Sequence, residues 1–213
     1  MSPIENVKIG PSAIFTLAFV TLGPLKVLGP FAQRTHGLGD SAVRKIATRT
    51  FLIATMAVIV GGLAGTELLT KWYVSVAALE ITAGLIFLLV ALNQLMAQYE
   101  PASTGAPAPL PSSPTAAALA LTFPTVLTPY GIAGVIVLFA NSDSIERTLM
   151  IIGLLVVVMV LNYLAMLYAR RILVGAVMIV LQVLGAVLAV IQAALAVQFI
   201  ILGLHGLGVL SGT

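Results

Sequence analysis

Six apolar runs constrain this chain most, because each is about as long as the ~20 residues that a helix needs to cross a bilayer. Of the 213 residues, 60% are hydrophobic and only 8% are charged, too few to coat a soluble domain. We therefore expect an all-α integral membrane protein with a single membrane domain, residues 1–213. The predicted spans lie near 11–32, 42–64, 72–96, 116–140, 147–169 and 172–204.

Charge and cysteine content narrow the function classes. The net charge is +3, but the ten basic residues are scattered at the ends of apolar runs and form no basic face, so nucleic acid is not an expected partner. The chain has no cysteine, which excludes disulfides and thiolate metal sites. Glu5 and the lack of a basic cluster before the first run indicate that the first helix is not a cleaved signal peptide.

Between the third and fourth runs lies "AQYEPASTGAPAPLPSSPT", residues 97–115. Prolines, serines and small residues bury little apolar surface, so this segment is expected to be an extended linker. It divides the chain into one set of three helices, residues 1–96, and a second set, residues 116–213.

The two sets show a short internal similarity. Residues 22–29, "LGPLKVLG", match residues 127–134, "LTPYGIAG", at a constant offset, although so biased a composition also produces such matches by chance. Three helices cross the membrane an odd number of times, so a second copy would run upside down relative to the first. The sequence thus predicts two inverted three-helix repeats in which helices 1 and 4 are discontinuous, a recurring plan of secondary transporters.

Helix breakers interrupt the first and fourth runs. Pro24 and Pro129 each remove a backbone donor and disturb the turn before them, and such backbone is tolerated at membrane depth where protein or a water-filled cavity satisfies it. Each break also creates a half-helix N-terminus that favours an anionic group. Simple kinking of the two helices is the alternative. The solute-binding residues that we predict are Gly23, Pro24, Lys26, Gly29, Thr128, Pro129, Tyr130 and Gly131.

Lys26 is costly near mid-membrane unless it is paired or hydrated. Glu80 is the only acidic residue well inside an apolar run, on a helical stripe with Gly84, Phe87 and Ala91. We expect Lys26 and Glu80 to form an ion pair that either locks two helices together or takes part in substrate or proton binding. Alternatively, Lys26 extends to the membrane interface.

An intramembrane enzyme is the rival class, and the sequence argues against it. Such an enzyme needs paired aspartates, a serine with a histidine, or a metal-binding cluster, and no aspartate or histidine falls inside a predicted span. No catalytic residue, metal or cofactor is therefore predicted. Asn162 and Gln192 are interpreted as hydrogen-bonding groups between helices rather than as ligand-binding groups.

Lysine and arginine at the helix ends predict the orientation. One side carries more of them than the other, which favours that side as cytoplasmic and both termini on the non-cytoplasmic side. The richer side carries Arg34, Arg44, Lys45, Arg49, Arg170 and Arg171, and the other carries Lys8, Lys71 and Arg147.

Four segments carry a family pattern: "GPLKVLGPF" at 23–31, "SAVRKIATRTFLIA" at 41–54, "VSVAALEITAGLIFLLVALNQL" at 74–95 and "FPTVLTPYGIAGVI" at 123–136. They resemble the MarC family of six-helix bacterial inner-membrane proteins, also described as neutral amino acid transporters. The resemblance implies two inverted repeats, a bacterial inner-membrane location and, for some members, transport of small neutral amino acids such as alanine or glycine.

The chain departs from the family pattern at both breaks. The usual Asp/Asn-Pro-x-Gly-Asn reads Gly-Pro-Leu-Lys-Val at 23–27, and Gly-Pro-Gly reads Thr-Pro-Tyr at 128–130, while Glu80 occupies a basic or neutral position of relatives. We therefore predict a transporter or exporter of a small polar solute, working by alternating access; the alternative is a non-transporting scaffold or partner subunit. The prediction allows for a coupling proton or sodium ion and for a homo-oligomer.

Overall fold

The computed structural model describes residues 10–96, 110–111, 113–173 and 176–210, and every regular element in this part of the chain is helical. Most of the predicted linker, 97–115, lies outside the described residues. The elements, in chain order, are α1 (Pro11–Leu22), α2 (Leu25–Arg34), α3 (Asp40–Lys71), α4 (Val76–Met96), α5 (Pro114–Leu121), the π-helical turn η1 (Thr122–Val126), α6 (Pro129–Ala140), α7 (Ile145–Ile172) and α8 (Ala176–Gly206).

Five segments of the described chain are long and apolar enough to cross a membrane, with α1 and α2 taken together as one of them. A sixth is reached when residues 114–126 and 129–140, which are bent by 71° at the break between them, are taken as one span. The helices therefore agree with the predicted all-α membrane protein.

Helix α3 continues past the predicted span at 42–64 and ends at Lys71. The glycines at 61–65 do not end the helix. Two of them instead allow α6 to approach α3 closely. A Cβ atom on Gly62 would lie 2.6 Å from Cγ1 of Val135, and one on Gly65 would lie 2.6 Å from Cδ1 of Ile136. Within the run "GGLAG" at 61–65, Gly62 and Gly65 thus form a packing surface inside a long helix.

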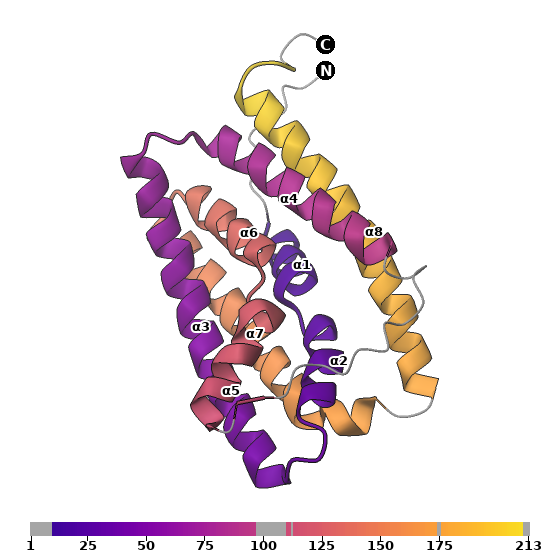
Figure 1. Cartoon of the computed structure of the whole chain (residues 1–213). Coiled ribbons are helices and arrows are strands. Elements are labelled where there is room, and N and C mark those ends of the chain that lie inside the picture. Colours follow the sequence, from indigo (N-terminus) through magenta and orange to yellow (C-terminus); the bar gives the residue numbers. More distant parts are fainter. Residues whose placement is uncertain (1–9, 97–109, 112, 174–175, 211–213) are drawn as a thin grey trace.

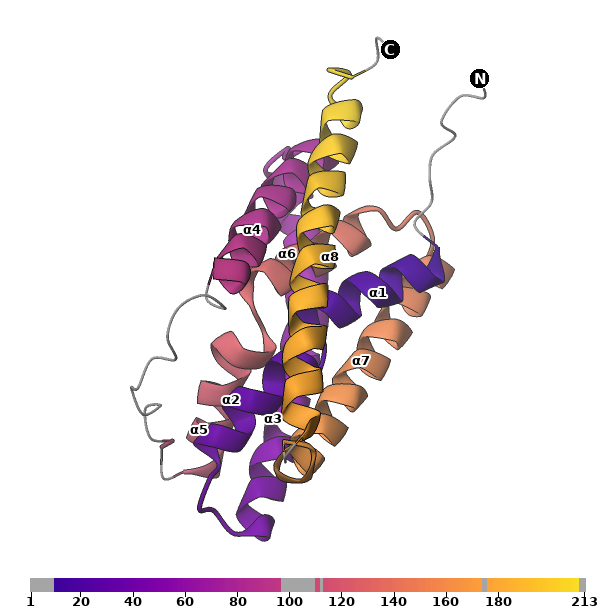
Figure 2. The same ribbon diagram turned by 90° about the vertical axis from the view of Figure 1, so that its right-hand side faces the viewer.

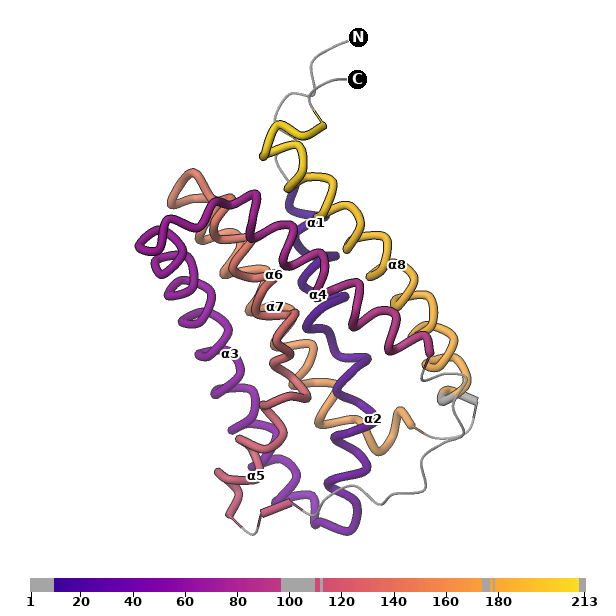
Figure 3. Tube along the Cα trace, turned by 45° about the horizontal axis from the view of Figure 1, so that its top comes forward, coloured from indigo at the N-terminus to yellow at the C-terminus, as the bar shows by residue number. Residues whose placement is uncertain are grey.

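Helices α1, α2 and α6 of the interrupted segments lie between α3 and α8 in the view of Figure 1, and α5 lies at the edge beside α3. Helices α4 and α8 run side by side and form the most extensive helix pair, while α3 lies on the opposite side of the molecule against α5, α6 and α7. Seen from the side, α8 is one long rod that reaches from the end near α5 to the end near the start of α4 (Figure 2). Helices α1 and α6 contact each other in the interior, as the Cα trace also shows (Figure 3).

Candidate functional site

The first break lies between α1 and α2. Gly23 adopts an extended conformation, with φ −75° and ψ 169°, and directs the chain out of α1. A Cβ atom at this position would lie 1.9 Å from the carbonyl oxygen of Phe19, so only glycine fits. Helix α2 then begins at Leu25, which places Lys26 in its first turn.

The break frees the carbonyl group of Leu22, and Asn162 of α7 binds it. The Asn162 side-chain amide donates to the Leu22 oxygen at 2.7 Å and to the Val158 oxygen at 3.0 Å. Asn162 is only 1% exposed, and its own Oδ1 atom has no hydrogen-bond partner. A buried amide therefore supports irregular backbone inside the protein, as membrane-depth breaks require.

The second break precedes α6. Leu127 is extended, with φ −94° and ψ 101°, and the Thr128 hydroxyl accepts a hydrogen bond at 3.1 Å from the backbone N–H of Gly131. Thr128 is thus the N-cap and Pro129 the first helical residue, a favourable position for proline. Tyr130 follows in the first turn of α6 and is 5% exposed.

Lys26 joins the two breaks. Its ammonium group donates to the hydroxyl of Tyr130 and, at 3.1 Å, to Oε1 of Gln192 in α8. The same nitrogen lies 4.3 Å from the centre of the Tyr130 ring, within the range of a cation–π interaction. Gln192, 1% exposed, also donates to the carbonyl oxygen of Phe87 in α4 at 3.4 Å. One side chain of α2 is thereby connected to α6, α8 and α4.

The predicted ion pair between Lys26 and Glu80 is wrong in its geometry. Glu80 instead accepts a hydrogen bond from the Asn141 side-chain amide, at the end of α6, over 3.2 Å. The part of α4 at the level of Lys26 is Phe87, and Glu80 lies two turns earlier, about 10 Å along the helix axis. The two side chains share an inward face of the bundle but lie at different depths.

Most of the other predicted residues gather where the breaks meet. Gly131 packs against Leu22, because a Cβ atom on Gly131 would lie 2.4 Å from Leu22 Cδ2. Gly29 does not belong to this group, since nothing lies within 4 Å of where its Cβ atom would be. Pro129 is exposed at the start of α6 and shapes the helix rather than lining the contact.

The sequence alone indicates that two site residues, Asn162 and Gln192, link helices. They do link helices, but their partners are the freed Leu22 carbonyl and the Lys26 ammonium. In the sequence, each is an amide side chain in the middle of an apolar run. That pattern indicates a hydrogen bond inside the bundle but does not identify the partner.

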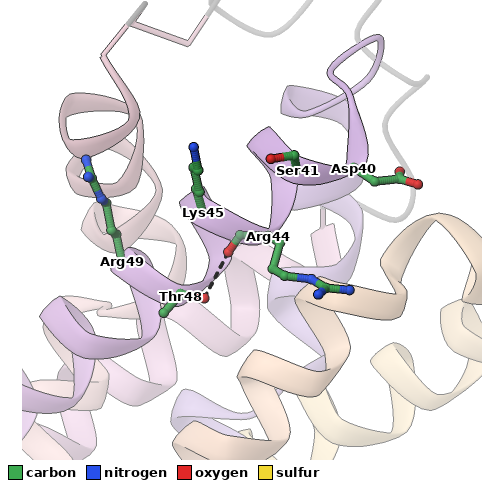
Figure 4. A pocket seen from close by; sticks show the side chains of 6 residues that line it. All are labelled: Asp40, Ser41, Arg44, Lys45, Thr48 and Arg49. Atoms are coloured by element: carbon green, nitrogen blue, oxygen red, sulfur yellow. Dashed lines mark hydrogen bonds between the residues drawn. The ribbon is translucent and has the colours of Figure 1, made fainter.

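A separate hollow of about 560 Å³ lies at the start of α3 (Figure 4). Its side chains all come from this one helix, and Lys45 and Arg49 point to one side while Arg44 points to the other. Arg49 donates to the Thr115 hydroxyl at the start of α5. The lining residues are Asp40, Ser41, Arg44, Lys45, Thr48 and Arg49. This hollow is distinct from the contact between the breaks. No group of three or more histidine or acidic side chains in the described part of the chain is arranged to hold a metal ion.

The model of the MarC family integral membrane proteins matches residues 11–207, which include every helix from α1 to α8. The chain belongs to the MarC family. The resemblance inferred from the sequence is therefore confirmed, and so is a multi-pass integral membrane protein. No curated protein and no solved structure matches the chain.

Proposed function

We propose that this MarC family protein moves a small polar solute across the membrane by alternating access, and that the solute binds where the two interrupted segments meet. The observation that carries the proposal is the hydrogen bonding of Lys26 to Tyr130 and Gln192 inside the bundle. A polar group at membrane depth is costly and is retained mainly where it serves a substrate pathway or locks helices together. Small neutral amino acids such as alanine and glycine are the first candidates, because the family resemblance implies them.

The order of helices supports two inverted repeats with discontinuous first members. In each half an interrupted segment, α1–α2 or α5–α6, is followed by two longer helices, α3 and α4 or α7 and α8. We propose a bacterial inner-membrane location with the termini on the non-cytoplasmic side. The ends of α2 and α7 and the start of α3, which carry most of the basic residues, lie together at one end of the molecule (Figure 1), and this supports the orientation.

Coupling to a proton or sodium ion through Glu80 is also part of the proposal. Glu80 is held by Asn141 away from Lys26, so it is a separate polar position within the bundle. Uptake by a Glu80→Gln variant should lose its dependence on an imposed ion gradient if Glu80 carries out the coupling.

Reconstitution in proteoliposomes tests transport. Purified protein is screened for uptake of small amino acids and other small polar solutes, beside Lys26→Met and the surface control Lys71→Met. The proposal expects uptake that Lys26→Met abolishes and Lys71→Met preserves. Uptake that is equal in both variants would remove the Lys26 site from the mechanism.

A non-transporting scaffold is the second candidate, and the close packing of the breaks favours it. Leu22 occupies the space beside Gly131, and Phe87 Cζ would lie 2.9 Å from a Cβ atom on Gly134. A scaffold predicts that no solute raises the thermal unfolding temperature of the purified protein, whereas a transporter predicts that its substrate does.

A further inference from the structure

The Lys26 ammonium group has only neutral partners. They are the phenol of Tyr130, the amide oxygen of Gln192 and the face of the Tyr130 ring. Among the side chains that the structure describes, no carboxylate lies within ion-pair distance of Lys26; the ion pair at the basic end of the molecule joins Arg170 to Asp40. Buried charges are ordinarily paired, so this lysine, when protonated, lacks a counter-charge from the protein.

Two helix N-termini add to the positive character of the site. Lys26 lies in the first turn of α2, and Tyr130, its partner, lies in the first turn of α6. The N-terminal end of a helix carries a partial positive charge, which favours an anion. Lys26 and the N-terminal ends of α2 and α6 therefore all favour a negatively charged ligand.

We propose that this site takes a small carboxylate monoanion, such as a short 2-hydroxy acid, in preference to a zwitterionic amino acid; the inference rests on the proposed transport function. The carboxylate accepts hydrogen bonds from Lys26 and Tyr130 and supplies the missing negative charge. A zwitterion brings its own ammonium group, which leaves the excess positive charge of the site in place. The acidic side chain inside the bundle, Glu80, lies about 10 Å away along α4.

Asn162 supplies a second, independent observation. Its Oδ1 atom is buried without a hydrogen-bond partner beside the first break, where the same amide holds the Leu22 carbonyl. A neutral amide oxygen can accept a hydrogen bond from a ligand hydroxyl, and it would accept one from an ammonium group as well. Asn162 therefore adds an unpaired acceptor beside the first break, while the preference for an anion rests on Lys26.

Lactate and alanine form a matched pair of probes, since they differ only in a hydroxyl or an ammonium group on the same carbon skeleton. We expect lactate to raise the thermal unfolding temperature of the full-length protein and to be taken up by proteoliposomes at least tenfold faster than alanine. Lys26→Met should abolish the preference, and Lys71→Met, which removes an exposed lysine at the end of α3, should retain it.

Gln192→Glu provides the sharper test. It places a carboxylate where the amide oxygen lies 3.1 Å from the Lys26 nitrogen, and so supplies the counter-charge from within the protein. Lactate affinity should fall at least tenfold and alanine affinity should not fall. Gln192→Met removes the same amide without adding charge, and should weaken lactate binding less than Gln192→Glu does.

The outcomes separate this inference from the transport proposal. Uptake of alanine at a rate equal to or above that of lactate overturns the preference for a monoanion and leaves transport standing. No uptake of any solute by folded, reconstituted protein overturns both. If Gln192→Glu does not fold, the comparison of lactate with alanine in the wild type and in Lys26→Met decides the question alone.

Discussion

Phe87 of α4 packs edge-on against Tyr130 of α6, with ring centroids 5.9 Å apart and ring planes at 88°. Phe87 makes a second edge-on contact with Phe199 of α8, at 5.6 Å. These contacts hold the Tyr130 ring in the orientation in which its hydroxyl meets Lys26. The polar contact between the breaks is therefore supported by an aromatic cluster that connects three helices.

Tyr130→Phe tests the contribution of the hydroxyl separately from that of the ring. The ring contacts with Phe87 are retained, but the Lys26 ammonium loses a hydrogen-bond acceptor in a buried site, so stability should fall by about 1–3 kcal/mol. Thermal or denaturant unfolding of the detergent-solubilised protein measures the change. Tyr73→Phe is the matched control, because Tyr73 is 95% exposed, and it should leave the stability unchanged. Equal stabilities for the two variants would contradict the assigned contact.

Gly131→Ala should destabilise the protein through overpacking. The new Cβ atom would lie 2.4 Å from Leu22 Cδ2 and 2.9 Å from the Thr128 hydroxyl, so both breaks must shift, at a cost of about 1–3 kcal/mol. Gly153→Ala on α7 is the control, since nothing lies within 4 Å of its Cβ position. That control should be neutral or slightly stabilising in the same unfolding assay. A neutral Gly131→Ala would show that the breaks do not pack as described.

Asn162→Leu should cost about 1–3 kcal/mol, because the Leu22 carbonyl freed by the first break would lose its donor in a dry environment. Asn93→Leu makes the same change at an exposed position of α4 and should be tolerated. Hydrogen exchange at α1 and α2, followed by mass spectrometry, should rise in Asn162→Leu and not in Asn93→Leu. Unchanged exchange in both variants would indicate that the break is supported by another group.

At the basic end of the molecule, the contacts of Arg170 predict unequal effects for its two partners. Arg170 donates to the carbonyl oxygen of Thr35 and lies 3.7 Å from Asp40, whose side chain is fully exposed. Exposed ion pairs contribute little, so Asp40→Asn should leave the unfolding midpoint unchanged at low and high salt. Arg170→Met removes a charge-assisted hydrogen bond and should cost about 1–3 kcal/mol. The reverse order of effects would show that the ion pair is the more important contact.

The orientation in the membrane can be tested with single cysteines, because the natural chain has none. Ser41→Cys, exposed at the basic start of α3, should react with a membrane-impermeant maleimide only after the cells are permeabilised. Ser75→Cys, exposed before α4 at the opposite end, should react in intact cells. The opposite labelling pattern would invert the proposed topology.

The sequence predicted the all-α class and the approximate positions of five or six membrane spans, because span length and hydropathy are local properties. Pro24 lies between α1 and α2, and Pro129 is the first residue of α6, positions that suit proline. The stripe of Gly84, Phe87 and Ala91 on α4 does face the interior, as helical periodicity indicated.

The sequence did not predict the partner of Lys26. Periodicity gives the face of a helix on which a residue lies, but not its depth relative to a residue on another helix. Glu80 lies on α4 two turns before Phe87, which is the residue of α4 at the level of Lys26. Asn162 and Gln192 do hydrogen-bond between helices, as the sequence indicated, but it could not give their partners, which are backbone and side-chain atoms of distant segments.

Leu22 takes part in two contacts at once: its carbonyl is bound by α7, and its side chain fills the space beside Gly131 of α6. A displacement of α7 that pulls on the carbonyl would therefore withdraw the side chain from α6 as well. Leu22 thus couples the position of α7 to the packing of α6. A tilt of α7 alone would loosen the contacts at the break after α1 and at the break before α6 together.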